Sequence, residues 1–257
     1  MSRPDFLDLP PRAEKPRAAG LTHLLDKGSP VPDVEALLSV AAGSIDLWKL
    51  GWGTAYLDPG VEEKLPLLAR HDVRACVGGT LLEAAWLQGR ATECLDWAAE
   101  TGFPCVEVSN GAVGMPIEEK HRLIAEASDR FVVVSEVGSK DPEATVSPAA
   151  WAEEVAADLE AGAEWVLTEG RESGTVGLYT PRGEVREDVV EAVTRVAGPA
   201  RMIFEAPRKS QQAWLIRRFG PEVNLGNVRL DEVLGVEALR LGLRADTIKA
   251  PSDEAGS

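Results

Sequence analysis

Cysteine is scarce in this sequence, and the few cysteines are not spaced as a functional motif. Among 257 residues there are three, Cys76, Cys94 and Cys105, and no two of them form a Cys-x-x-Cys pair. An odd number without such spacing argues against a disulfide framework and indicates reduced thiols, so we expect a cytoplasmic protein. Cys76 and Cys105 stand inside apolar runs, which favours core positions over roles as nucleophiles.

Long apolar runs and an excess of basic residues are also missing. No run approaches the roughly 20 apolar residues that span a bilayer, and residues 1–17 lack the apolar centre of a signal peptide. The 27 Lys and Arg residues are outnumbered by 42 Asp and Glu residues, for a formal net charge of −15. Because nucleic acids and anionic membranes bind basic surfaces, we expect neither as a partner. An anionic small substrate would need a local group of cations.

Short apolar runs alternate with helical patterns along most of the chain. The predicted strands are 20–26, 45–51, 74–80, 105–110, 131–138, 164–170, 201–207 and 222–228. Stretches between them, such as 31–42 and 147–163, open on Ser, Pro or Asp signals and carry apolar residues at helical spacing. The pattern predicts one α/β domain over residues 1–257, a single (β/α)8 TIM barrel with an irregular segment at 1–19 and a polar tail at 248–257. An open doubly wound sheet is the alternative.

Polar residues gather where the predicted strands end, and a barrel of this kind carries its active site at those ends. They are Asp26, Lys27, Lys49, Gly78, Gly79, Thr80, Glu107, Ser109, Asn110, Glu136, Ser139, Lys140, Glu169, Arg171, Glu172, Glu205, Arg208, Lys209, Asn224 and Asn227. Carboxylates inside apolar strands are costly to bury unless they are paired or hold a metal. Oxygen ligands without a His or Cys cluster suit Mg2+, and the cations suit a phosphorylated or carboxylated substrate. The residues alone therefore predict a metal-assisted enzyme acting on a small anionic compound, with structural ion pairs such as Lys49–Glu107 as the alternative.

Two further residues near these ends have a predicted place but no assigned chemistry. His23 lies within the first strand, where a core or supporting position is favoured over a position in the site itself. Trp52 follows the second strand in Gly-Trp-Gly-Thr, which is a suitable place for a side chain that lines the mouth of a pocket.

Nine segments around these strand ends occur in a characteristic order. They are KPR (15–17), GLTHLLDKG (20–28), WKLGWGTAY (48–56), GGTLLEAAWLQG (78–89), EVSNG (107–111), SEVGSKDPE (135–143), EGRESGTVGLY (169–179), IFEAPRKSQQAWLIRRFGPEVNLGNV (203–228) and EALRLGLRADT (237–247). Together they resemble the phosphosulfolactate synthase family. The resemblance implies a (β/α)8 barrel and a carbon–sulfur lyase that uses Mg2+ to add sulfite to phosphoenolpyruvate. The implied product is (2R)-3-phosphosulfolactate, formed in the first step of coenzyme M biosynthesis.

The resemblance also implies roles for individual residues. Sulfite attacks the methylene carbon, charge moves into the carboxylate as an enediolate, and Lys140 protonates C2. The implied metal ligands, of which two or three are expected to bind Mg2+, are Glu107, Glu136, Glu169 and Glu205. The implied substrate-binding residues are Lys15, Arg17, Lys27, Lys49, Arg171, Lys209, Gly226 and Asn227. Gly226 and Asn227 are included because the loops after strands seven and eight often hold phosphate in this fold.

The chain departs from the family pattern at three positions within the matching segments. Ser139 stands where many relatives carry a first lysine, Asn110 where they carry aspartate, and Gly170 where they carry alanine. These changes leave open a paralogous lyase that adds another nucleophile to phosphoenolpyruvate or to a related enolpyruvyl acid. A non-catalytic, stress-associated relative is a further alternative, which the nearly complete set of polar strand-end residues disfavours. Family analogy implies a homo-oligomer.

Overall fold

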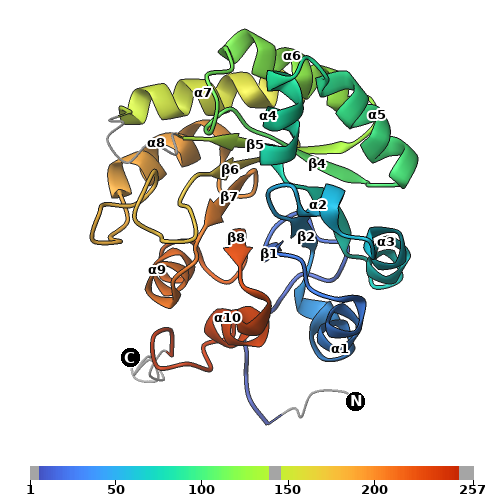
Figure 1. Cartoon of the computed structure of the whole chain (residues 1–257). Helices are drawn as coiled ribbons and strands as arrows, with labels where there is room; N and C mark the ends of the chain where they lie inside the picture. Colours follow the sequence, from blue (N-terminus) through green and yellow to red (C-terminus); the bar gives the residue numbers. More distant parts are fainter. Residues whose placement is uncertain (1–5, 139–145, 249–257) are drawn as a thin grey trace.

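The computed structural model, which describes residues 6–138 and 146–248, has eight parallel strands closed into a barrel in chain order (Figure 1). The strands are β1 (Thr22–Asp26), β2 (Leu47–Leu50), β3 (Arg74–Val77), β4 (Cys105–Val108), β5 (Val132–Val137), β6 (Trp165–Thr168), β7 (Met202–Glu205) and β8 (Leu225–Val228). Each strand lies within one of the predicted runs. The predicted (β/α)8 barrel is therefore confirmed, and the open sheet is wrong because β8 pairs with β1.

Helices surround the barrel and follow the strands along the chain (Figure 1). They are α1 (Val31–Ala41), α2 (Thr54–Leu57), α3 (Val61–Ala69), α4 (Gly79–Leu87), α5 (Ala91–Thr101), α6 (Ile117–Ser128), α7 (Pro148–Glu160), α8 (Glu187–Ala197), α9 (Lys209–Phe219) and α10 (Val233–Arg240), with short 3-10 turns η1 (Ala42–Ser44) and η2 (Leu230–Glu232). No helix in the described ranges is long and apolar enough to cross a membrane.

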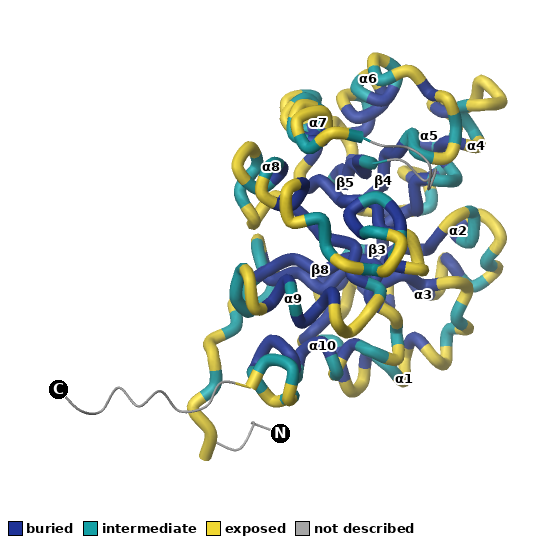
Figure 2. Tube along the Cα trace, turned by 90° about the vertical axis from the view of Figure 1, so that its left-hand side faces the viewer, coloured by how far each residue is buried: buried dark blue, intermediate teal, exposed yellow. Residues whose placement is uncertain are grey.

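The helix α8 illustrates how the sequence produces this outer layer. Glu187 and Asp188 stand in its first turn, where carboxylates interact favourably with the positive end of the helix dipole. Its Val189, Val190 and Val193 are buried on one face, and the valines drive that face against the barrel. In Figure 2 the strands are dark blue at the centre, while the outer faces of the helices are yellow, which marks exposed residues.

Inside the barrel, a separate apolar cluster fills the space below the strand ends. Its buried members are Leu21, Leu47, Cys76, Cys105, Val134, Trp165, Leu167 and Ile203. Successive side chains of a strand point to opposite faces, so the residue two positions further along also points inward. Cys76 and Cys105 are fully buried here, and burial raises the pKa of the Cys76 thiol. The prediction that both are core residues is confirmed.

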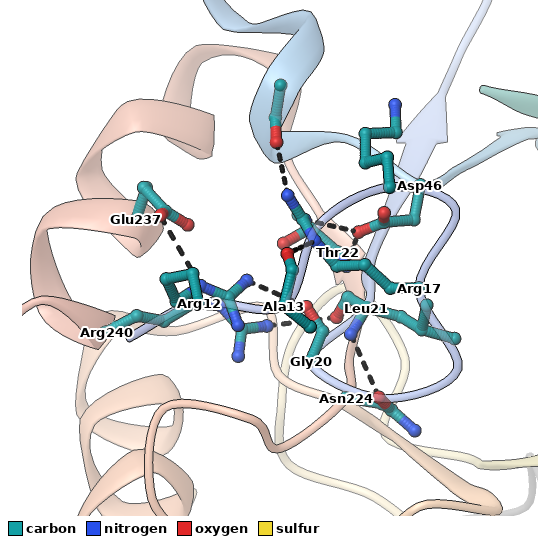
Figure 3. A network of polar contacts seen from close by, with 12 residues as sticks. Arg12, Ala13, Arg17, Gly20, Leu21, Thr22, Asp46, Asn224, Glu237 and Arg240 are labelled. Carbon is teal, nitrogen blue, oxygen red and sulfur yellow. Dashed lines mark hydrogen bonds and ion pairs between the residues drawn. The ribbon is translucent and has the colours of Figure 1, made fainter. Parts of the chain in front are cut away.

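The opposite end of the barrel, where the strands begin, is closed by arginine side chains (Figure 3). Arg12 donates to the carbonyl oxygens of Gly20 (2.9 Å) and Pro221 (3.1 Å). The fully buried Arg240 donates to the carbonyl oxygens of Val223 and Leu21, and burial lowers the pKa of its guanidinium to about 9. These contacts attach the segment before β1 to β8 and α10, so this end serves to close the fold.

Lys15 and Arg17 belong to this closing segment and not to the strand-end rim. Arg17 forms a buried ion pair with Asp46 (3.1 Å), which comes just before β2. Lys15 donates to the carbonyl oxygens of Ala42 (3.1 Å) and His71 (2.8 Å), which precede β2 and β3. Both side chains therefore lie at the end of the barrel away from the predicted glutamates, which corrects their assignment to substrate binding.

Candidate active site

A pocket of about 450 Å³ opens at the carboxyl ends of the strands. It is lined by Leu25, Lys49, Trp52, Thr80, Glu107, Ala112, Glu136, Glu169, Arg171, Glu172, Ser173, Glu205 and Asn227. Strands β2, β4, β5 and β7 and the residue directly after β6 supply charged side chains one layer above the apolar cluster, because the inward positions continue by alternation from residues of that cluster. The four predicted glutamates and Lys49 thus meet in one cavity.

Lys49 is the central cation of this pocket. Its Nζ lies 2.9 Å from Glu107 Oε2 and 3.7 Å from Glu205 Oε1, and its side chain is only 5% exposed. Burial alone would lower the pKa of Lys49, but Glu107, Glu205 and Glu136 outweigh it and raise that pKa above its ordinary value. Lys49 therefore remains charged. Its pair with Glu107, expected as a structural alternative, is present in the pocket.

Backbone N–H groups hold the carboxylates in place. Gly79 N–H donates to Glu107 Oε1 (3.0 Å), and Gly170 N–H donates to Glu205 Oε2 (2.7 Å). A Cβ at Gly170 would lie 2.7 Å from the Tyr179 ring, so a glycine gives this close approach without displacing the tyrosine. The tyrosine hydroxyl in turn donates to the Glu205 carbonyl oxygen.

Negative charge exceeds positive charge within the cavity. Burial raises the pKa of Glu205 to about 7, with Glu136 and Glu107 adding to the effect while Lys49 and the Gly170 N–H oppose it. Among the described residues that line the pocket, five glutamates outnumber the two cations, Lys49 and Arg171. A site in this state binds a proton or another cation readily.

We expect the burial of Glu205 among other carboxylates to make the stability of the protein depend on pH. Folded Glu205 keeps its proton up to about pH 7, whereas an unfolded carboxyl loses it near its ordinary pKa of 4.5. The folded state binds more protons between these values, so its free energy of unfolding falls as pH rises, by on the order of 3 kcal/mol. Glu205→Gln removes this contribution. The free energy of unfolding is measured by urea titration, with a chelator present, for the variant and for wild type. The value for the variant minus the value for wild type should rise between about pH 4.5 and about pH 7. A difference that stayed constant over this range would contradict the raised pKa of Glu205.

His23 lies beneath the charged layer, and its pKa is lowered where that of Glu205 is raised. It is fully buried, and neither ring nitrogen has a hydrogen-bond partner among the described residues. Burial lowers the pKa of His23 well below its ordinary value, and Lys49 adds to this effect. The histidine is therefore neutral in the folded protein, which agrees with the predicted core or supporting position.

The backbone around the pocket holds several unusual conformations. Positive φ angles occur at four non-glycine residues of the described chain, and three of them, Trp52 (54°), Arg171 (53°) and Asn227 (51°), line the pocket. Such conformations are uncommon outside glycine and concentrate at functional sites. Trp52 was expected at the pocket mouth, and that expectation is confirmed.

An irregularity in β8 explains the position of Asn227. The pairing with β1 passes from Thr22↔Leu225 to Leu24↔Val228, so β8 has one extra residue at this point. A bulge of this kind redirects side chains, and Asn227 donates from Nδ2 to Glu205 Oε1. Its Oδ1 is buried without a hydrogen-bond partner among the described residues. Asn227 can therefore still accept a hydrogen bond from a ligand.

The remaining predicted ligands are divided between the pocket and other places. Arg171 lines the pocket, and Lys27 lies at its mouth, paired with Glu172.

Gly226 lies inside β8, where a Cβ would meet Leu167 (2.7 Å). It therefore belongs to the barrel interior, which corrects its assignment to a phosphate loop. Lys209 pairs on the surface with Asp246 (3.0 Å) and is not among the described residues that line the cavity, so its part in substrate binding stays a prediction. Lys140 lies outside the described residues.

Two residues that support the site received no role from the sequence. Glu83 on α4 is buried, accepts from the Ala112 N–H (2.9 Å) and also accepts from the Ser109 hydroxyl. Tyr179, whose hydroxyl donates to the Glu205 carbonyl oxygen, is the second. Neither stands at a strand end, where the repeating pattern of the sequence places the polar residues. Both lie in segments that carried the resemblance, GGTLLEAAWLQG and EGRESGTVGLY, which is the signal that was present.

The donor set of the pocket fits Mg2+ in its chemistry. Within the described residues, no three His, Cys, Asp or Glu side chains are grouped as ready ligands of one ion. Carboxylate oxygens are nevertheless the donors that this cation prefers, and burial together with the neighbouring Glu136 and Glu107 raises the pKa of Glu205. Binding would therefore require the carboxylates to turn toward a common centre.

Comparisons with known proteins agree on one family. A family model described as "(2R)-phospho-3-sulfolactate synthase (ComA)" matches residues 10–246. The chain is 44% identical over 250 residues to "Phosphosulfolactate synthase" of Methanothermobacter thermautotrophicus, covering 95% of this chain and 96% of the relative. It is 42% identical over 247 residues to the protein of the same name in Bacillus subtilis, covering 95% of this chain and 98% of the relative.

Solved structures are similar at the level of the fold. One is 3-hexulose-6-phosphate synthase from Salmonella typhimurium, with a TM-score of 0.56 and 12% identity over 85% of this chain and 97% of that one. Another is thiamine phosphate pyrophosphorylase from Pyrococcus furiosus, with a TM-score of 0.53 and 15% identity over 87% of this chain and 94% of that one. At such low identity, these likenesses concern the barrel alone.

Proposed function

Because the chain belongs to the phosphosulfolactate synthase family, we propose that it adds sulfite to phosphoenolpyruvate to form (2R)-3-phosphosulfolactate, with Mg2+ as cofactor. The observation that carries the proposal is the family match over residues 10–246, which includes every described residue that lines the pocket. The pocket itself supports the anionic substrate class, because Lys49 and Arg171 reach into it. In this reading the enzyme is a carbon–sulfur lyase that works in the cytoplasm.

The proposed reaction joins two anions and then takes up one proton. The sulfur lone pair of sulfite attacks the methylene carbon of phosphoenolpyruvate and forms the carbon–sulfur bond. The electrons of the double bond move to C2 and its carboxylate, and a proton added at C2 completes the product. Sulfite is a good nucleophile, so no covalent intermediate with the protein is required. The protein must hold the two anions close together and balance the charge that develops.

Lys49 is suited to balancing charge but not to donating the proton. Its raised pKa keeps it cationic, and its contacts with Glu107 and Glu205 fix the position of its Nζ. A fixed cation aimed at developing charge stabilises a transition state without reorganising during the reaction. A general acid works best with a pKa near the operating pH, so we assign the proton at C2 to Lys140 and not to Lys49.

Two or three of the four glutamates would hold the metal, and its chemistry would be the withdrawal of charge from the substrate's carboxylate oxygens. Glu107 and Glu205 already accept backbone N–H bonds that fix their orientation. Oriented carboxylates of this kind bind metals more tightly than freely rotating ones. The proposal therefore gives the backbone of Gly79 and Gly170 a supporting role.

Replacing each glutamate by glutamine is expected to sort the metal ligands. A variant at a true ligand should need about 10–100-fold more Mg2+ for half-maximal product formation, because it loses one charged donor. The matched control is Glu191→Gln on α8, since Glu191 pairs with Arg218 on the surface away from the pocket (3.3 Å). If all four pocket variants kept the wild-type Mg2+ requirement, the proposed metal site would be wrong.

A further inference from the structure

Two loops that follow non-adjacent strands meet over the mouth of the pocket. Lys27 follows β1, and Glu172 lies in the loop after β6, while β7 and β8 stand between these strands in the barrel. The two side chains nevertheless form an ion pair. Lys27 Nζ also lies 5.6 Å from the centre of the Trp52 ring, which belongs to a third loop. Glu172 thus reaches across the rim to a cation on the other side.

The backbone that carries Lys27 is held in place by the contacts of the preceding residue, Asp26. The neighbouring Asp26 is fully buried, and its Oδ1 accepts from the N–H groups of Gly28 (3.0 Å) and Ser29 (2.8 Å). Its Oδ2 accepts from the Trp48 indole (2.9 Å) and lies 3.4 Å from Nζ of the fully buried Lys64. These bonds tie the turn after β1 to β2 and α3. The cationic side of the ion pair therefore has a fixed backbone.

Glu172 lies in a short arm of the loop, residues 171–173, and a hydrogen bond on each side of this arm serves as an anchor. On one side, the Arg171 N–H donates to Glu169 Oε1 (2.7 Å). On the other, Gln211 Nε2 donates to the Gly174 carbonyl oxygen (2.8 Å). Residues 171–173 between these anchors are exposed, and the side chains of Lys27 and Glu172 are 49% and 47% exposed. The arm presents Arg171 to the pocket and Glu172 to Lys27.

We propose that Glu172 occupies, in the substrate-free protein, a place on Lys27 that an oxyanion group of the substrate takes over when it binds. This inference rests on the proposed function and adds an internal competitor to it. Exposed ion pairs are weak and easily exchanged, whereas the oxygens of a phosphate or sulfite group form stronger, charge-assisted hydrogen bonds with a cation. Arg171, which precedes Glu172 in the chain and lines the pocket, offers a second cation on the same loop. Glu172 would thereby disfavour ligands that carry too little charge to displace it.

Binding measurements on a double-mutant cycle test this competitor. Equilibrium dialysis measures the affinity for phosphoenolpyruvate, with Mg2+ and without sulfite, for wild type, Glu172→Gln, Lys27→Met and the double variant. We expect Glu172→Gln to bind about threefold to fivefold more tightly than wild type, the range that an exposed ion pair allows. In the Lys27→Met background the same change should alter affinity by less than about twofold, because no cation is left to release. Glu191→Gln, which breaks an exposed pair elsewhere, should bind like wild type.

The outcomes distinguish phosphoenolpyruvate from sulfite as the occupant of Lys27, and they test the competitor apart from the proposed function. Tighter binding of phosphoenolpyruvate that depends on Lys27 supports the competitor and assigns the place to that substrate. Unchanged phosphoenolpyruvate affinity with a lower KM for sulfite in Glu172→Gln supports it and assigns the place to sulfite. If neither changes, or if the effect persists without Lys27, the inference is overturned. Failure of wild type to bind phosphoenolpyruvate would contradict the proposed function instead, and the same cycle titrated with inorganic sulfate would then decide the inference.

Discussion

Lys49→Met is expected to lower turnover by about a hundredfold to a thousandfold, because it removes the fixed cation beside the developing charge. It should also destabilise the folded protein by about 3–5 kcal/mol near neutral pH, since a buried ion pair loses one partner. The structural reason is the position of Nζ, 2.9 Å from Glu107 and 3.7 Å from Glu205 in a cavity wall with little solvent. Turnover of phosphoenolpyruvate with sulfite and urea unfolding measure the two effects.

A second variant separates the loss of catalysis from the loss of stability. In Lys49→Met with Glu107→Gln, both members of the closest pair become neutral, so much of the lost stability should return. Activity should stay as low as in the single variant, because the cation is still missing. A single variant that folds with native stability and turns over at the wild-type rate would contradict the role given to Lys49.

Lys140→Ala is expected to lower turnover by about a hundredfold to ten-thousandfold, with little change in the binding of phosphoenolpyruvate. The step after sulfite attack needs a proton at C2, and the raised pKa of Lys49 makes it a poor donor. Lys140 follows Glu136 by four residues, in the part of the chain beyond the described end of β5. Single-turnover kinetics would measure the chemical step apart from binding.

Arginine at this position distinguishes an acid from a simple cation. Lys140→Arg keeps the positive charge but cannot give up a proton at ordinary pH, so it should be about as slow as the alanine variant. If arginine restored turnover, Lys140 would act by binding an anion. If the alanine variant kept near-normal turnover, the donor would lie elsewhere, and Glu205, with its pKa raised to about 7, would be the next residue to replace.

The barrel could be predicted because the sequence repeats one simple pattern. Runs such as 105–110 and 131–138 are apolar for about one strand length and end in polar residues, as strands buried on both faces do. Their structural counterparts, β4 and β5, end within those runs. The meeting of Glu107 and Glu136 follows from the same pattern, since all parallel strands of a closed barrel end on one rim.

Positions outside the repeat could not be predicted in the same way. Lys15 and Arg17 match a family segment, but nothing in KPR shows that the chain before β1 runs along the other end of the barrel. Lys209 pairs with Asp246, a contact across 37 residues that depends on how the chain after α10 packs. Such contacts arise from tertiary packing and leave no local periodicity in the sequence.

The difference between Gly226 and Asn227 also depends on tertiary structure. Both were expected to bind phosphate, yet the extra residue in β8 leaves Gly226 within the barrel and brings Asn227 into the pocket wall. The contact between Glu172 and Lys27 was equally hidden, because each residue stands in a different loop and only the closed barrel brings those loops together. Strand ends could thus be predicted, whereas the side chains that cross the rim could not.

Phosphorus NMR of the purified protein with phosphoenolpyruvate, sulfite and Mg2+ tests the central claim most directly. The proposed function predicts a new phosphate-ester resonance that grows as the phosphoenolpyruvate signal declines, and only when all three components are present. Adding a chelator or omitting sulfite should abolish it. Phosphoenolpyruvate that stayed intact with all three components present would contradict the claim. If the protein still bound it in a Mg2+-dependent way, sulfite would be the wrong nucleophile for this pocket.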